Sequence, residues 1–219
     1  MTNFQINIVS DTVCPWCYIG KKRLEKGIAA YKEKHPDSND TFSTSWFPFY
    51  LNPNTRESAD TQKVFEERFG KERTAMLQER MLQVGEAEGI SFKYGGKTGN
   101  TRDSHRLIQL GKIKSPQVQT RVVEELFAAY FENEKDITSH EVLTDLGVKA
   151  GLNEKEVKEW LESGKGGPEV DKEVRDAVEQ NISGVPNFTL NGKFEIGGAQ
   201  EPAAFVQLFE RLKRQEGNL

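Results

Sequence analysis

The chain contains only two cysteines, Cys14 and Cys17, and two residues separate them in the stretch DTVCPWCYIG. A pair this close could bind a metal ion, form a structural disulfide or react as a dithiol. A structural zinc site needs four ligands, which commonly include a second Cys or His pair. The three histidines, His35, His105 and His140, lie far apart in the sequence, so we expect no metal site.

The expected compartment favours a reacting dithiol over a structural disulfide. The first residues, MTNFQINIVSD, contain no basic segment and no small-residue cleavage site, and they read as a strand. Nothing in them directs the chain to export, so we expect a cytoplasmic protein. Lasting structural disulfides are rare in reducing compartments, where a close pair of cysteines is more often catalytic or metal-binding.

Composition argues against two classes of partner. The 219 residues include 30 basic and 34 acidic side chains, which gives a net charge of −4. This balance provides no electrostatic footprint for nucleic acid. No stretch approaches the ~18 consecutive apolar residues that a membrane span requires. We therefore expect neither nucleic acid nor membrane as a partner.

The elements around the cysteines form a β–α–β pattern. Residues 4–11, FQINIVSD, alternate apolar and polar side chains, as a short strand does. Apolar residues then recur at helical spacing, which predicts an amphipathic helix over about 15–34. A second strand is predicted within residues 41–53, TFSTSWFPFYLNP. The cysteines therefore lie where the first strand gives way to the helix.

The middle of the chain, about residues 59–181, is rich in helix-forming residues and carries helix start signals. Ser115 followed by Pro116 reads as an N-cap with proline in the first turn. Thr138 and Glu141 have the spacing of a capping box. We therefore expect this segment to be an all-helical insertion.

The end of the chain returns to β character. VPNFTLNGKFEIGGA contains two short alternating runs joined by Asn191–Gly192, a strong hairpin signal, and a helix-spaced segment follows. The predicted fold is an α/β domain of βαβ and ββα halves with the helical insertion between them. The expected boundaries are 1–58, 59–181 and 182–219.

The spacing of the cysteines gives each a separate role in thiol exchange. Cys14 lies among the unpaired N–H groups at the start of the helix, where the helix dipole favours a thiolate. We expect Cys14 to be the more exposed residue and the nucleophile, and Cys17, one turn further, to resolve the mixed disulfide. Pro15 suits the first helical turn, and Trp16 is expected to offer an apolar surface to partners.

A second signal is the Val185–Pro186 dipeptide that opens the hairpin. Proline removes a ladder donor, so it belongs at a strand start or an edge. The plain interpretation is a strand-entry turn. The alternative is a cis peptide bond opposite the cysteines, with the Val185 backbone free to pair with an extended substrate. Only about 5–6% of X–Pro bonds in folded proteins are cis, so the residues alone leave both open.

Taken together, these motifs resemble the DsbA-like thioredoxin-fold oxidoreductases, and most closely their FrnE-like branch. That branch is related to 2-hydroxychromene-2-carboxylate isomerases and kappa-class glutathione transferases. The resemblance covers essentially the whole chain. It rests on DTVCPWCYIG and GVPNFTLNGK…GAQ, with FYLNP (49–53) and NTRDSHRL (100–107) as supporting matches.

The resemblance implies a thioredoxin fold in which Cys14 is the nucleophile and Cys17 the resolving cysteine. It implies that Pro186 is a cis-proline facing them and that Val185 offers its backbone to peptide or glutathione. No tightly bound cofactor is implied, although glutathione is a candidate co-substrate. Relatives are often dimeric, which makes a homodimer the expectation.

Two further residues near these motifs have open roles. His105, in DSHRL, matches a position common in the branch, and its plain interpretation is a helix histidine satisfied by a neighbour. Asp11 is expected to be a turn or cap residue, or alternatively a carboxylate that relays protons near the dithiol.

Three functions follow from these expectations. The leading one is a thiol–disulfide oxidoreductase acting on protein or small-molecule disulfides. The second is a glutathione-dependent isomerase or transferase, although a serine typically stands at the Cys14 position in those relatives. The third is a non-enzymatic binding or accessory protein. Oxidant, reductant and isomerase use the same dithiol, so the sequence does not fix the direction of the reaction.

Overall fold

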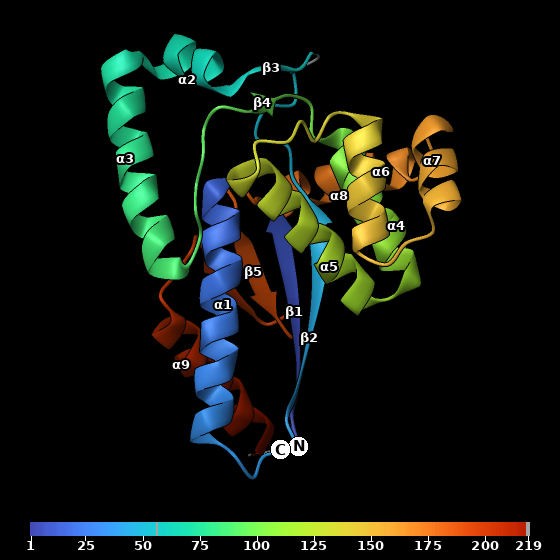
Figure 1. The fold of residues 1–219 in the computed structure, drawn as a ribbon. Helices are drawn as coiled ribbons and strands as arrows, with labels where there is room; N and C mark the ends of the chain where they lie inside the picture. The colour runs from blue at the N-terminus through green and yellow to red at the C-terminus, as the bar shows by residue number, and fades with distance from the viewer. Residues whose placement is uncertain (56, 218–219) are drawn as a thin grey trace.

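The computed structural model describes residues 1–55 and 57–217, and its centre is a four-stranded sheet (Figure 1). The strands lie in the order β2-β1-β5-β6. β1 pairs in parallel with β2, whereas β5 is antiparallel to both β1 and β6. The strand bounds are β1 Asn3–Ser10, β2 Thr41–Pro48, β5 Asn187–Leu190 and β6 Phe194–Gly197. This mixed sheet with flanking helices is the predicted DsbA-like thioredoxin fold.

Helices α1 (Pro15–Lys34) and α9 (Pro202–Gly217) pack against each other and against the inner face of the sheet. The alternating pattern of β1 explains this packing, because Phe4, Ile6 and Ile8 are buried between exposed polar residues. The Phe4 ring contacts Tyr31 of α1 and Phe209 of α9, with centroid distances of 5.4 and 5.1 Å. The aromatic core therefore fixes α1 on the sheet.

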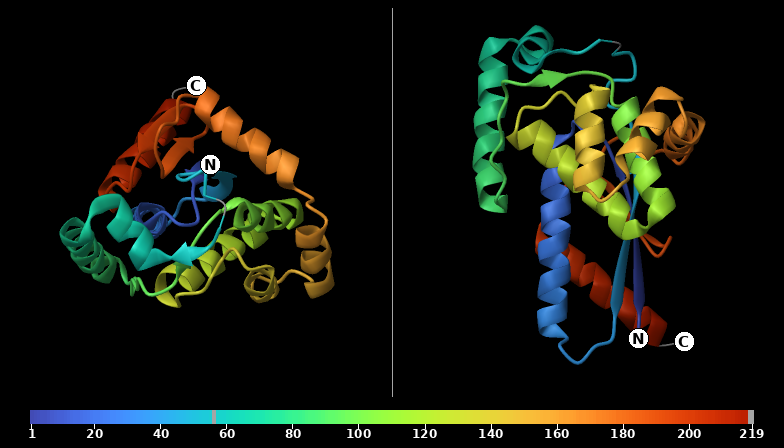
Figure 2. Two further views of the ribbon diagram at one scale, coloured as in Figure 1. Left: turned by 90° about the horizontal axis from the view of Figure 1, so that it is seen from above. Right: turned by 45° about the vertical axis from the view of Figure 1, so that its right-hand side comes forward.

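Seven helices, one π-helical turn and two very short strands lie between β2 and β5 in the described chain (Figure 2). Their bounds are β3 Ala59–Asp60, α2 Thr61–Phe69, α3 Lys71–Glu88, β4 Lys97–Thr98, α4 Arg102–Lys114, α5 Pro116–Phe127, η1 Ala128–Glu132, α6 His140–Lys149, α7 Glu154–Glu162 and α8 Gly167–Glu179. The β3–β4 ladder is a detail that helix signals alone did not predict. The proposed domain boundaries stay a prediction.

Local signals predicted several element ends. Ser115 accepts a hydrogen bond from the Val118 N–H at 3.1 Å and caps α5, as expected. The predicted capping box at Thr138 is wrong by one residue, because Ser139 caps α6. The Thr138 hydroxyl instead donates to Asp136 at 2.6 Å.

The predicted hairpin between β5 and β6 is present in the structure. Asn191 and Gly192 both have positive φ, 48° and 64°, which is the backbone that an Asn-Gly turn supplies. The turn is closed by a hydrogen bond from the Lys193 N–H to the Leu190 carbonyl at 3.0 Å.

Among the described helices, none is both long and apolar enough to cross a membrane.

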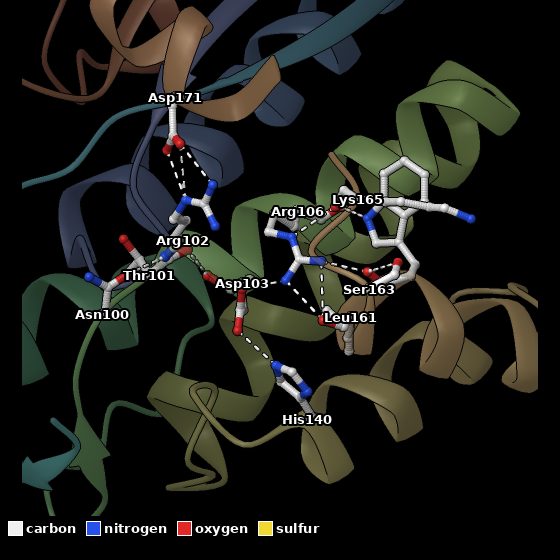
Figure 3. A network of polar contacts seen from close by, with 12 residues as sticks. Asn100, Thr101, Arg102, Asp103, Arg106, His140, Leu161, Ser163, Lys165 and Asp171 are labelled. Carbon is white, nitrogen blue, oxygen red and sulfur yellow. Dashed lines mark hydrogen bonds and ion pairs between the residues drawn. The ribbon is translucent and has the colours of Figure 1, made fainter. Parts of the chain in front are cut away.

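A polar network fixes α4 within the segment between β2 and β5 (Figure 3). The buried Arg106 guanidinium donates to Asp103 and to the carbonyls of Trp160, Leu161 and Lys165 at the end of α7. Asp103 also bonds His140 of α6 at 2.8 Å. These contacts tie α4 to α6 and to the end of α7.

Candidate active site

The first turn of α1 carries the two cysteines at the end of the sheet where the segments between β2 and β5 gather (Figure 1). Cys14 is the N-cap residue, and its N–H donates to the Asp11 carbonyl at 3.1 Å. Its side chain makes no capping bond, and the first turn contains no acidic residue. The positive end of the helix therefore favours a thiolate at Cys14 without competition from a carboxylate in that turn.

The two thiols are reduced and 3.4 Å apart. Cys14 is 4% exposed and Cys17 is 1% exposed, so both are buried and Cys14 is the more exposed of the two. Burial, followed by the neighbouring Cys14, raises the pKa of Cys17 well above its ordinary value. The Ser10 hydroxyl and the Asp11 backbone oppose this rise by hydrogen-bonding to the sulfur. Cys17 is therefore the member of the pair that holds its proton more tightly than a free thiol.

The Val185–Pro186 dipeptide lies directly beside Cys14, although 171 residues separate Val185 from it. The peptide bond is cis, as the resemblance implied. The Cys14 thiol donates to the Val185 carbonyl at 3.7 Å. Gly20 of α1 allows this approach, because a Cβ there would lie 2.9 Å from Pro186 Cγ. The fold therefore brings the two sequence motifs together.

Asp11 and His105 form a buried pair that the sequence did not connect. The Asp11 side chain is 1% exposed and that of His105 is 3% exposed. Asp11 Oδ2 accepts from the Leu51 N–H at 2.8 Å, while Oδ1 lies 3.3 Å from His105 Nε2. Asp11 therefore fixes the loop after β2 and also pairs with the histidine. A spacing of 94 residues gives no local signal for such a contact.

Trp16 does not lie free on the surface. Its ring is half-buried, and the Arg80 guanidinium of α3 lies 5.9 Å from the ring centroid. This distance allows a cation–π interaction, which ties α1 to α3. The predicted role of Trp16 toward partners stays a prediction.

Two clefts open beside Pro15, and sequence reasoning had not indicated them. One lies between the first turn of α1 and α3, has a cavity volume of about 50 Å³, and has Leu77, Met81 and Tyr94 among its lining residues. A second, with a volume of about 300 Å³, shares Pro15 and Tyr130 with the first. Aromatic residues at helical spacing, such as Tyr130, are interpreted from the sequence as core residues. The packing of η1 instead places Tyr130 in the wall of both clefts.

The smaller cleft contains a polar atom without a hydrogen-bond partner among the described residues, the Tyr94 hydroxyl oxygen. This hydroxyl is buried and makes no hydrogen bond to any part of the chain that the structure describes. Burial raises the pKa of Tyr94 to about 12, so the phenol is protonated at neutral pH. A mostly apolar cleft with one free hydroxyl suits a ligand that is largely apolar and carries an acceptor.

Among the described residues, no three metal-ligating side chains cluster.

Comparisons with known proteins agree with this geometry. The family described as "DSBA-like thioredoxin domain" matches residues 5–210. The uncharacterized protein YwbO of Bacillus subtilis is 25% identical over 199 residues, which are 89% of this chain and 90% of that protein. A structure described as a probable DsbA oxidoreductase, SCO1869 from Streptomyces coelicolor, has a TM-score of 0.85 and 26% identity, and the match covers 95% of this chain and 89% of that one.

A more distant structure shares the fold. The 2-hydroxychromene-2-carboxylate isomerase structure matches with a TM-score of 0.72 and 16% identity, covering 98% of each chain. At this identity the likeness concerns the fold alone. The match of the family over nearly the whole chain, with the dithiol at the start of α1, leads to one conclusion: the chain belongs to the DsbA-like thioredoxin-domain family of thiol–disulfide oxidoreductases.

Proposed function

We propose that this protein exchanges disulfides with its substrates through Cys14 and Cys17. The observation that carries the proposal is the reduced pair, 3.4 Å apart at the N-terminus of α1, with Cys14 against the Val185 carbonyl. At this separation the two sulfurs need only a small approach to form a bond. The raised pKa of Cys17, caused chiefly by its burial, supports attack by Cys14 and resolution by Cys17.

The exchange proceeds in two balanced steps. The Cys14 thiolate attacks one sulfur of a substrate disulfide, a bond forms between them, and the other substrate sulfur leaves as a thiolate. Cys17 then loses its proton and attacks Cys14 Sγ, which releases the second substrate thiolate and closes the Cys14–Cys17 disulfide. Two electrons pass from the dithiol to the substrate, and the reverse sequence oxidises a substrate dithiol.

The surroundings of Cys14 favour a substrate with an extended backbone and an apolar group. Val185 presents a carbonyl that an incoming N–H could bond, and the clefts beside Pro15 offer apolar walls. A peptide disulfide or glutathione disulfide fits this description. Assignment to the FrnE-like branch, a cytoplasmic location and a homodimer belong to the same proposal.

Paired cysteine variants test the proposal. Cys14→Ser is expected to abolish catalysis of the reduction of insulin disulfides by dithiothreitol or glutathione, because the attacking thiol is removed. Cys17→Ala is the matched control, and it is expected to accumulate a mixed disulfide on Cys14 that mass spectrometry detects. Full activity in Cys14→Ser would contradict the proposal.

The cleft beside Pro15 also supports a second candidate, a glutathione-dependent isomerase or transferase. There the same first turn of α1 would hold glutathione, and an organic substrate would occupy the cleft near the Tyr94 hydroxyl. This function predicts saturable glutathione binding and turnover of an electrophile that persists in Cys17→Ala. Absence of turnover across a broad panel of electrophiles would remove it.

A further inference from the structure

A small cavity lies beside Ser10 at the end of β1, and it shares no lining residue with the two clefts beside Pro15. It holds about 10 Å³, which is room for the centre of one water molecule. Most of its walls are apolar, but Ser10, Thr12 and His105 also line it. A buried water needs two to four polar partners, and these three residues can supply them.

The hydrogen bonds of His105 fix which of its nitrogens carries a proton. Nε2 lies 3.3 Å from Asp11 Oδ1 and 3.2 Å from the Phe49 carbonyl oxygen. A carbonyl oxygen can only accept, so Nε2 must carry the hydrogen. Nδ1 of the neutral ring is then a lone-pair acceptor, and it makes no hydrogen bond to the described residues. His105 lines the cavity, and its Nδ1 is free of hydrogen bonds to the described residues.

The other end of the cavity connects to the dithiol through Ser10. A hydrogen bond from the Ser10 side chain opposes the rise in the pKa of Cys17, and Ser10 is also among the residues that line the cavity. Cys17 is 1% exposed, and its pKa is raised chiefly by burial, so its proton has no direct route to bulk water. Resolution of a mixed disulfide nevertheless requires the Cys17 thiolate.

We propose that Asp11 and His105 form an internal proton relay for Cys17, connected to it through Ser10 and one water in this cavity. The inference rests on the proposed thiol exchange and concerns its second step. As Cys17 Sγ bonds to Cys14 Sγ, the Cys17 proton passes through Ser10 and the water to His105 Nδ1. Asp11 stabilises the resulting imidazolium at Nε2, as a buried carboxylate does for a general-base histidine. The proton later returns along the same route or passes to the released thiolate.

Other ionisable groups near His105 do not replace this path. The Tyr50 ring lies 5.8 Å away, and burial, followed by the charge of Asp171, raises the pKa of Tyr50, so its phenol stays protonated. Asp171 is itself paired with Arg102 at 2.8 Å. Asp11 is the carboxylate in direct contact with the ring among the described residues.

Rapid mixing of the reduced protein with the chromogenic disulfide dithiobis(nitrobenzoate) separates the two steps. Attack by Cys14 releases the first coloured thiolate at a rate proportional to reagent concentration. Resolution by Cys17 releases the second at a rate independent of concentration. His105→Gln keeps an amide donor near Asp11 but cannot accept a proton, and His140→Gln is the matched control on α6.

The relay predicts a selective effect. In His105→Gln the second phase slows by about 100-fold at neutral pH, the size of a general-base contribution, while the first phase is unchanged. The difference from the native protein narrows at alkaline pH, because the population of the Cys17 thiolate then rises without the relay. His140→Gln leaves both phases unchanged.

Three results would overturn the inference: an unchanged second phase, equal slowing of both phases, or a deficit that persists at alkaline pH. If the variant does not fold, Ser10→Ala and the native protein in deuterium oxide provide the test. Both are expected to slow the second phase selectively, and no effect in either rejects the relay. Absence of any first phase in the native protein would instead reject the proposed function.

Discussion

Helix α4 contributes to two aspartate–histidine pairs whose surroundings are opposite. His105 of α4 pairs with Asp11 at 3.3 Å, and both side chains are at most 3% exposed. Asp103 of α4 pairs with His140 at 2.8 Å, and those side chains are 31% and 45% exposed (Figure 3). The Asp103–His140 pair lies against solvent and the Arg106 guanidinium, and the Asp11–His105 pair lies beside a cavity that Ser10 also lines.

The difference shows that a carboxylate and a histidine in contact do not by themselves make a functional site. Burial disfavours the charged form of Asp103, but the bonds from Arg106 and His140 outweigh it and hold its pKa below the ordinary value. This pair therefore stabilises the fold. The Asp11 pair has no arginine partner among the described contacts, and its histidine borders a cavity that Ser10 also lines.

The largest expected effect concerns stability at the Asp103 pair. Arg106→Met leaves buried carbonyls at the end of α7 without a donor and removes the partner of Asp103. We expect the free energy of unfolding to fall by about 3–5 kcal/mol, measured by urea denaturation. Both phases of thiolate release should stay unchanged where the variant is folded. A stable Arg106→Met protein with altered release would contradict the division between the two pairs.

Equivalent carboxylate changes sharpen the comparison. Asp11→Asn removes the charge that stabilises protonated His105, so the second release phase should slow by about 10- to 100-fold. Asp103→Asn, its counterpart in the exposed pair, should leave that phase unaffected. Rapid-mixing kinetics on both variants measure the difference. An equal rate of the second release phase in the two variants would show that the two pairs do not differ in function.

A change at Gly20 tests whether the Val185–Pro186 loop affects the reaction of Cys14 more than that of Cys17. In Gly20→Ala the new Cβ would lie 2.9 Å from Pro186 Cγ and 3.1 Å from Phe188, so α1 and the Val185–Pro186 loop must move apart. We expect a loss of about 1–3 kcal/mol in stability and a slower first phase, with the second phase less affected. Thermal unfolding and rapid mixing measure the two effects. Selective slowing of the second phase would contradict the assignment of this loop to Cys14.

The smallest expected effect is a pH dependence of stability from the exposed pair. The pKa of Asp103 is lowered in the folded protein, so its contribution is present above the ordinary value of 3.8 and is lost as the pH falls below about 4. Partial exposure limits this to about 1 kcal/mol. Asp103→Asn should therefore show a shallower loss of stability in acid. A slope identical to that of the native protein would show that Asp103 is not the source.

Sequence reasoning succeeded where the signal is local. The bounds of α1, the cap at Ser115 and the Asn191–Gly192 turn follow from residue types whose backbone preferences hold in any context. Sequence reasoning did not predict the contacts between distant segments. Asp11 and His105 were each singled out, but their pairing depends on how α4 packs behind β1 and β2. The clefts at Tyr94 and Tyr130 likewise arise from the packing of η1 and α3, which periodicity cannot place.

The central claim is that Cys14 and Cys17 form a working redox pair, and its most direct test is equilibration in graded mixtures of reduced and oxidised glutathione. Thiol labelling with mass analysis then gives the state of the pair at each ratio. The account predicts a reversible disulfide between the two cysteines with a potential between roughly −270 and −120 mV. Cys14 that stays reduced throughout, or stops at a stable glutathione adduct, would contradict it.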